Sequence, residues 1–541
     1  MIFSRARFDP GIVVAAILPL IGILPTLNAG VINTADGPLH VQRIVAMSIM
    51  LGEGNLYPRW IPWFHIGFGY PIFNYYPPGV FTLGGLLVRL GLTATAAFTA
   101  VATLAWILGS VGTYRLARRF LPAHAAILGA MLWAYAPSRL FEVWDQGSLP
   151  QMMAAALIPW LCDGIIGVAR QPSRRGLLGI ALPLAGIILS HQPITFITAL
   201  FVVPLALVVP FWESRREPAD TATNHPTNGE LAPPVPFTNA GCSSRFGAST
   251  LSFDKGSFLR RLLHVGGGLA LGVGLAAIFL LPLALELRYV QAARGAQDTV
   301  DYLVSNFLQP SEIFAQPPAA DLTDLRYELP TTLGVIGGVL AVAGILALAK
   351  GRQTGLLALL VIALLFVLFM LVEASLSIWL GIPFFRQLRF PERFLRVGAV
   401  LIALAGSASI LLLPRRWQIG GLAAAMIAVL VAALPMIYPN QRFITYDRLT
   451  ASEEISFELT QYTWGTTSYD EFDPIWGDDI PLPRQAPEQE AYAADPLRVV
   501  VNRVDMARYG DIMQVEQVDS QAVRVRLTQR HPVRFHQYYY P

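Results

Sequence analysis

The chain has 541 residues and a formal net charge of +3; 54% of its residues are hydrophobic and only 14% are charged. A soluble globular domain carries about 25% charged residues, so this composition excludes that class and indicates a polytopic α-helical membrane protein. The apolar runs are continuous and do not alternate, which argues against a membrane β-barrel.

Runs of roughly 18 or more apolar residues, each long enough to cross a hydrocarbon core about 30 Å thick, recur along the chain. Cytoplasmic loops are enriched in Lys and Arg, and placing every basic cluster on that side gives one consistent map. We expect about eleven spans in a plasma membrane, with a cytoplasmic N-terminus and an extracytoplasmic C-terminal domain. The predicted spans are 11–31, 95–114, 122–137, 150–169, 176–191, 193–212, 262–285, 330–349, 354–373, 394–413 and 418–437.

The first outer loop, 32–94, is long and rich in aromatic residues. It contains one apolar segment, 77–90, which is too short for a full span and holds three glycines. Counting it as a span would place the following arginine cluster outside, so we expect a re-entrant or interfacial helix on the outer side.

The chain divides into four parts. An N-terminal membrane module, 1–212, is followed by a segment rich in Pro, Ser, Thr, Asn and Gly, 213–259, which is typical of a flexible cytoplasmic linker. A second membrane module covers 260–437. Residues 438–541 alternate in the manner of strands, in LRVVVNRV, IMQVEQV, AVRVRL and VRFHQYYY, and predict a β-rich domain. The sequence stops directly after such a run, which is what a truncated β-domain would show.

The stretch TADGPLHVQR, directly after the first span, supports two interpretations of its aspartate. Asp36 is a candidate N-cap for a helix over residues 37–52, with Pro38 in its first turn. Asp36 and His40 are also four residues apart and can share a helical face. A carboxylate there could act as a general base, or hold a divalent cation such as Mg or Mn together with His40. The two interpretations are compatible and both stay open.

Further polar residues fall on the outer side of this map. Glu142 and Asp145, with Arg139 nearby, follow a span; they form either a solvated loop or a second acidic group facing Asp36. His191, followed by Gln192, lies at a tight turn between two spans. A histidine there needs a polar partner or water, so it either satisfies a helix end or belongs to the site.

Two clusters are candidates for substrate binding. The run RQLRFPERF supplies Arg386, Arg389 and Arg393, which either snorkel at the interface or bind a phosphate. The aromatic part of the first outer loop is either a membrane-interface belt or a groove on which sugar rings stack. Its candidate contact residues are Arg59, Tyr70, Asn74 and Tyr75.

A first span followed by DGPLH, an aromatic outer loop ending in YYPPG, and RLARRF after the next span resemble the GT-C superfamily of membrane glycosyltransferases. More narrowly, APSRLFEVWDQGSLPQ, LSHQP, FRQLRFPERFL, GTTSYDEFDP and VRFHQYYYP resemble the bacterial membrane family called 6-pyruvoyl-tetrahydropterin synthase-related. The order and placement of these loose motifs carry the resemblance.

The GT-C resemblance implies a sugar donor carried on a polyprenyl phosphate and an active site at the outer membrane face. It also implies a carboxylate in the first outer loop as catalytic base or metal ligand, which would be Asp36, and a second-loop carboxylate, which would be Asp145 or Glu142. This sequence departs from the commonest pattern of two neighbouring acidic residues, because Asp36 is followed by His40.

Other chemistries find no support. The eight histidines contain no close pair and fall on different sides of the membrane, so no pterin chemistry is inferred. The basic clusters lie beside spans, where topology explains them better than nucleic-acid binding does.

The leading hypothesis is therefore an inverting transferase, embedded in the lipid bilayer, that moves a sugar from a polyprenyl-phosphate donor to an envelope glycan or lipid acceptor at the outer face. The predicted catalytic residues are Asp36, His40, Asp145 and His191, with Asp36 and His40 as candidate metal ligands. The predicted substrate-binding residues are Arg59, Tyr70, Asn74, Tyr75, Arg139, Glu142, Gln192, Arg386, Arg389 and Arg393. A lipid or glycan transporter and a non-catalytic envelope assembly protein remain alternatives.

Overall fold

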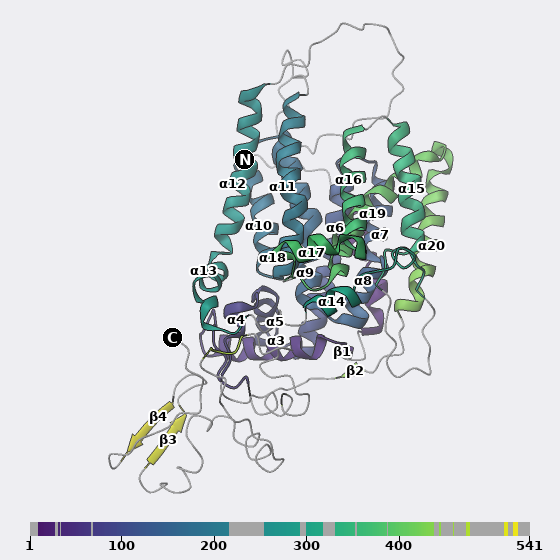
Figure 1. The fold of residues 1–541 in the computed structure, drawn as a ribbon. Coiled ribbons are helices and arrows are strands. Elements are labelled where there is room, and N and C mark those ends of the chain that lie inside the picture. The colour runs from purple at the N-terminus through teal and green to yellow at the C-terminus, as the bar shows by residue number, and fades with distance from the viewer. Residues whose placement is uncertain are drawn as a thin grey trace, which may run out of the picture.

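Long helices run side by side in one bundle, and a shorter helix, α3, lies across one end of it (Figure 1). We call this the α3 end. The computed structural model describes residues 9–26, 31–32, 34–65, 69–215, 254–292, 299–317, 331–351, 354–386, 388–437, 443–444, 458, 472–475, 513–517 and 523–527.

The N-terminal half supplies eleven of the α-helices that the structure describes, together with the 3-10 helix η1 and the π-helix η2. They are α1 (Pro10–Ile17), α2 (Leu20–Ile23), η1 (Leu24–Thr26), α3 (Gly37–Gly52), α4 (Ile72–Tyr75), α5 (Gly79–Arg89), α6 (Ala94–Arg118), α7 (Ala123–Ala134), α8 (Pro137–Phe141), η2 (Glu142–Gln146), α9 (Leu149–Arg170), α10 (Gly176–Ile188) and α11 (Gln192–Arg215).

The C-terminal half contributes further helices, several of them short 3-10 turns labelled η. They are α12 (Lys255–Leu275), α13 (Ala277–Glu286), η3 (Leu287–Tyr289), α14 (Thr299–Ser305), α15 (Val335–Lys350), α16 (Thr354–Met370), η5 (Glu373–Ser375), α17 (Leu376–Gly381), α18 (Pro383–Arg386), η6 (Pro391–Phe394), α19 (Leu395–Ser407), η7 (Ala408–Leu412), η8 (Arg415–Trp417) and α20 (Gln418–Ile437).

The prediction of a polytopic helical membrane protein is confirmed, but the number of spans is only partly supported. Six helices among the described residues are long and apolar enough to cross a membrane, or seven if one pair bent by 92° counts as a span. The other four predicted spans coincide with shorter apolar helices. The shortest of them, α7, has 12 residues; at 1.5 Å per residue it is about 18 Å long, well below the roughly 30 Å of a hydrocarbon core.

The apolar segment 77–90 forms α5, an eleven-residue helix that packs against α3. It is too short to span, as the sequence predicted. Glycine makes the approach close, because a Cβ on Gly84 would lie 2.8 Å from the side chain of Ile44. Together α3 and α5 cover the α3 end of the bundle (Figure 1).

Four short strands are described. β1 (Val31–Ile32) pairs with β2 (Phe443–Ile444), and β3 (Met513–Gln517) pairs with β4 (Val523–Leu527), both antiparallel. The strands predicted in IMQVEQV and AVRVRL are therefore confirmed, whereas LRVVVNRV, VRFHQYYY and most of the linker lie outside the described residues. One hairpin does not establish a β-rich domain, which stays a prediction.

Candidate active site at the α3 end of the bundle

Helix α3 begins at Gly37 and ends at Gly52, with Pro38 in its first turn, as the sequence predicted. Asp36 occupies the N-cap position, but its side chain makes no capping hydrogen bond. The hydroxyl Oγ1 of Thr34 accepts the hydrogen bond from the Gly37 N–H instead, at 3.1 Å. The capping role predicted for the Asp36 carboxylate is therefore wrong, because a second good cap residue lies two positions earlier.

The start of α3 is joined to the second predicted loop by backbone hydrogen bonds. The N–H groups of residues 35 and 36 donate to the carbonyls of Asp145 and Gln146, at 3.1 and 2.8 Å. Gly147 has φ +67°, and a Cβ there would lie 1.9 Å from Oγ1 of Thr34. A glycine at 147 is thus needed for this close approach, which places Asp36 beside the segment containing Asp145.

The carboxylate of Asp36 is partly buried and hydrogen-bonds the side chain of Ser148. Burial raises the pKa of Asp36 above its ordinary value, although the guanidinium charges of Arg43 and Arg393 and the Ser148 hydrogen bond act in the opposite direction. A raised pKa makes this carboxylate a better proton acceptor than an exposed aspartate.

Two histidines predicted in the site, His40 and His191, lie close to the arginines that act on Asp36. Both are buried, and burial lowers the pKa of His40 and of His191 well below the ordinary value, assisted by adjacent guanidinium groups. Both rings are therefore neutral at pH 7. His191 Nδ1 accepts the N–H of Ile194 at 3.3 Å, so this histidine also satisfies a helix start.

Sequence reasoning missed three members of this cluster. Arg43 lies with its guanidinium 4.2 Å from the ring centroid of Tyr76 and is 4% exposed. The second member is Tyr76, whose pKa is raised by burial. The third is Ser148, whose side chain hydrogen-bonds Asp36. Arg43 could have been found from spacing, since positions 36, 40 and 43 follow the i, i+4, i+7 pattern of one helical face.

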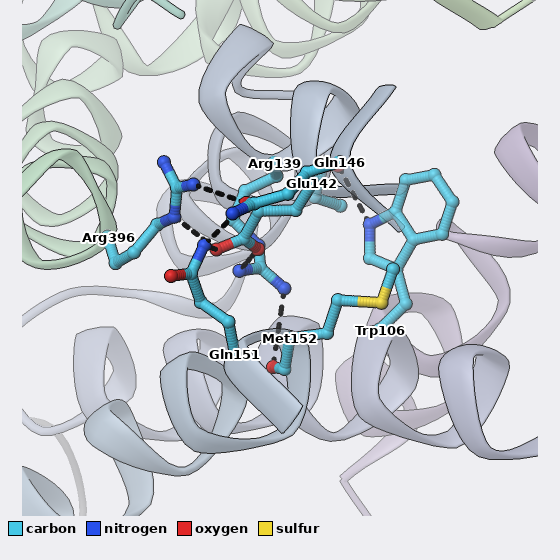
Figure 2. A network of polar contacts seen from close by, with 8 residues as sticks. Trp106, Arg139, Glu142, Gln146, Gln151, Met152 and Arg396 are labelled. Carbon is cyan, nitrogen blue, oxygen red and sulfur yellow. Dashed lines mark hydrogen bonds and ion pairs between the residues drawn. The ribbon is translucent and has the colours of Figure 1, made fainter. Parts of the chain in front are cut away.

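Beside this cluster lies a buried polar network centred on Glu142 (Figure 2). Glu142 is 0% exposed and forms ion pairs with both Arg139 and Arg396, and Gln151 Nε2 donates to its Oε1 at 3.1 Å. Gln146 Oε1 accepts from Gln151 at 2.8 Å and from Arg396 at 3.3 Å. We therefore interpret Arg139 and Glu142 as supports of the loop that holds Asp36; their predicted role in substrate binding stays a prediction.

Most of the predicted aromatic-loop residues converge on the end of α13. Arg59 Nη1 and Asn74 Nδ2 each donate to the carboxylate of Glu286 at 2.8 Å, and the hydroxyl of Tyr75 donates to its backbone carbonyl at 2.8 Å. Gln192 Nε2 donates to the carbonyl of Tyr75 at 3.0 Å. These contacts fasten the aromatic loop to neighbouring helices.

Tyr70 contacts the chain after the last membrane helix. Its hydroxyl accepts the N–H of Phe472 at 3.0 Å, and its ring stacks on His65 with centroids 5.6 Å apart. His65 Nε2 lies 3.2 Å from Oδ1 of Asp473. The motif GTTSYDEFDP thus packs against the aromatic loop through its last residues.

For the other two arginines predicted with Arg393, the structure gives little evidence on a phosphate-binding role. Arg389 has a left-handed backbone, with φ +57°. Arg386 ends α18, and its side chain lies outside the described residues. The phosphate-binding role of both stays a prediction, whereas Arg393 lies close enough for its charge to act on Asp36.

The donor set around Asp36 does not fit the predicted divalent metal. Arg43 Nη1 lies 3.4 Å from Nδ1 of His40, and the charges of Arg43 and Arg393 both act on Asp36. A divalent cation between Asp36 and His40 would be repelled by these guanidinium groups. In the part of the chain that the structure describes, no three His, Cys, Asp or Glu side chains are grouped to hold a metal ion.

Three solved structures share an overall likeness with the chain. The Archaeoglobus fulgidus oligosaccharyltransferase in the apo form is 13% identical, with a TM-score of 0.46, over 91% of this chain and 64% of that one. The arabinofuranosyltransferase AftD from Mycobacteria is 14% identical, with a TM-score of 0.42, over 85% and 29%. ArnT from Cupriavidus metallidurans, bound to undecaprenyl phosphate, is 14% identical, with a TM-score of 0.41, over 78% and 64%. The chain thus spans less than two thirds of each protein, and TM-scores this low carry no functional argument.

No curated protein matches the chain in sequence. Residues 73–218 match the family model described as "6-pyruvoyl-tetrahydropterin synthase related domain; membrane protein". This segment includes the end of the aromatic loop and the Arg139, Glu142, Gln146 and Gln151 members of the buried network, but not Arg396. The resemblance to the 6-pyruvoyl-tetrahydropterin synthase-related membrane family is therefore confirmed over residues 73–218 of this chain.

Proposed function

We propose that the protein is an inverting membrane glycosyltransferase that moves a sugar from a polyprenyl-phosphate donor to a hydroxyl of an envelope glycan or lipid. The observation that carries the proposal is the cluster at the α3 end. It combines a carboxylate of raised pKa, Asp36, with the guanidinium group of Arg393 and two neutral histidines. Such a cluster can accept a proton and stabilise an anionic leaving group in the same place.

The reaction would proceed in one displacement. The acceptor oxygen attacks the anomeric carbon and gives its proton to Asp36, while the bond from that carbon to the phosphate oxygen breaks with its electron pair. The polyprenyl phosphate leaves as an anion whose developing charge is stabilised by Arg393. His40 lies beside Arg43, and His191 lies beside Arg393. Because there is a single displacement, the configuration at the anomeric carbon inverts.

The proposal is tested with purified protein in lipid and a series of labelled polyprenyl-phosphate sugars. Asp36→Asn keeps the size of the side chain but removes the base, and it should lower turnover by about a hundredfold or more, the range of general-base contributions. Asp254→Asn is the matched control, because Asp254 is an exposed N-cap of α12 far along the chain. Equal transfer by Asp36→Asn and wild type would show that Asp36 is not the base.

We further propose that the α3 end faces the outside of a plasma membrane and that the N-terminus is cytoplasmic. The last turns of α6 and α9, at the ends of these helices away from α3, carry Arg115, Arg118 and Arg170. Basic residues are enriched in cytoplasmic segments, which supports this orientation. The native Cys242 in the linker is a reporter, because the remaining cysteine, Cys162, lies within α9.

An impermeant thiol reagent should not label Cys242 in intact cells and should label it after permeabilisation. A Cys242→Ser variant that carries Ser520→Cys should show labelling in intact cells. The reverse pattern would overturn the orientation and, with it, an outer-face reaction.

A transporter is the second candidate, favoured by the 92° bend between Leu357–Met370 and Glu373–Gly381. Broken helices are typical of transporter substrate sites. Uptake of an unmodified lipid-linked sugar into proteoliposomes, with no transfer product, would favour this alternative.

A further inference from the structure

Arg43 and His40 form a pair whose hydrogen bond fixes the proton on the histidine ring. Arg43 Nη1 lies 3.4 Å from His40 Nδ1, and a guanidinium group can only donate. Nδ1 is therefore the acceptor, and in the neutral ring the proton must be on Nε2.

The Nε2–H group of His40 is a buried donor without a hydrogen-bond partner in the described part of the chain. The side chain is only 2% exposed. Buried polar groups in folded proteins are normally hydrogen-bonded, and an exception calls for an explanation such as a catalytic role or a bound water or ion. An acceptor atom of a ligand would satisfy this donor.

The orientation of Arg43 suits an anionic ligand. Its Cζ lies over the ring of Tyr76, 4.2 Å from the centroid, and its side chain also hydrogen-bonds Tyr76. A guanidinium group carries five N–H donors in one rigid plane. This planar fork matches the oxygen atoms of a phosphate, and Arg393 acts on the same carboxylate, Asp36.

We propose that Arg43 and the Nε2–H of His40 bind a phosphate monoester group, forming the second arm of an anion subsite whose first arm is Arg393. The inference rests on the proposed function, in which this phosphate belongs to the lipid carrier. It changes the role of His40 from metal ligand to hydrogen-bond donor. In this subsite, the positive charge that faces the phosphate comes from arginine side chains, whereas the sequence predicted a divalent cation.

The test measures binding of farnesyl phosphate to the full chain in nanodiscs of phosphatidylcholine, with and without EDTA. Wild type should bind with the same Kd in both conditions. Arg43→Gln should raise Kd about tenfold or more, since charge-assisted hydrogen bonds to phosphate are lost. The matched control is Arg288→Gln, because Arg288 is exposed and stacks on Tyr289; it should leave Kd unchanged.

Conservative variants separate binding from folding. Arg43→Lys keeps the charge but loses the planar fork, so its Kd should lie between those of wild type and Arg43→Gln. His40→Gln retains a donor near the Nε2 position and should bind better than His40→Leu. If Arg43→Gln does not yield a monodisperse protein, the Arg43→Lys value and the order of the two His40 variants decide.

Competing ligands identify what the subsite recognises. Competition by inorganic phosphate would show that the phosphate group itself is bound, and lipid-only binding would show that the isoprenoid tail is also required. Equal binding of uncharged farnesol would overturn the proposal. So would a Kd for Arg43→Gln within about twofold of wild type, or binding that EDTA abolishes and Mg²⁺ restores.

The binding assay is independent of sugar transfer, so the two proposals can fail separately. If binding depends on Arg43 while Asp36→Asn transfers sugar normally, the subsite stands and the assigned base is wrong. If Asp36→Asn abolishes transfer while Arg43→Gln binds normally, the function stands and the subsite is wrong.

Discussion

Replacing Glu142 by alanine should destabilise the protein by about 3–5 kcal/mol in the free energy of unfolding. Glu142 is 0% exposed and is the carboxylate partner of two arginines, Arg139 and Arg396, which are 2% and 0% exposed. Breaking a buried ion pair by removing one partner typically costs about 3–5 kcal/mol, because the remaining charge stays buried. Here two guanidinium groups lose their shared partner, and Gln151 loses an acceptor. Glu142→Gln keeps one acceptor oxygen and should cost less.

The assay is equilibrium or thermal unfolding of the purified chain in detergent, with Glu213→Ala as the comparison. Glu213 pairs with Arg170 at 3.3 Å, and these side chains are 12% and 27% exposed. Partly exposed pairs contribute about 0–1 kcal/mol, so the two variants should differ by several kcal/mol. A loss for Glu142→Ala within 1 kcal/mol of the loss for Glu213→Ala would refute the structural role of this network.

Three further outcomes follow from the loop that carries Asp36. Gly147→Ala should lower both stability and turnover, because its Cβ would lie 1.9 Å from Oγ1 of Thr34. The control is Gly91→Ala, at φ +106° with no atom within 4 Å of the added Cβ, which should cost only the backbone strain of about 1 kcal/mol. Thr34→Ala should cost about 1 kcal/mol through loss of the α3 cap, measured by thermal unfolding, and a neutral result would contradict the cap assignment. Turnover should fall as pH drops through the raised pKa of Asp36, because the base must be ionised. Ser148→Ala removes a hydrogen bond that lowers this pKa, so the acid limb of kcat/KM should move to higher pH; an unchanged limb would mean that another group titrates.

Much of the helical architecture could be predicted from the sequence, because apolar runs and helix breakers are local signals. The start of α3 at Gly37 and the short α5 are examples. The capping atom could not be predicted, because Thr34 and Asp36 are both good cap residues and their backbone geometry decides between them. The number of spans is only partly supported, because an apolar run can be longer than its helix, as in the predicted span 122–137, where α7 covers only Ala123–Ala134.

The candidate site was predicted where residues are close in sequence and missed where they are not. Asp36 is the N-cap of α3 and His40 lies in its first turn, where the His40 N–H donates to the Asp36 carbonyl, so their spacing predicted their proximity. The partner of Arg59 and Asn74 is Glu286, which lies more than 200 positions away, and no sequence pattern indicates such a contact. Arg396 lies three positions after Arg393 and one helical turn deeper, and only the packing of α19 shows that it reaches Glu142.

The contact between Gln146 and Arg396 joins residues 250 positions apart, on either side of the linker. A ribosome that has reached the linker has therefore made the acidic groups of the site but neither Arg393 nor Arg396. The nascent N-terminal half can insert its helices, but the Glu142 network closes only after α19 enters the membrane. Two polypeptides divided within 216–253 should accordingly be inactive apart and regain transfer when synthesised in the same cell, with the buried arginine pairs holding the halves together.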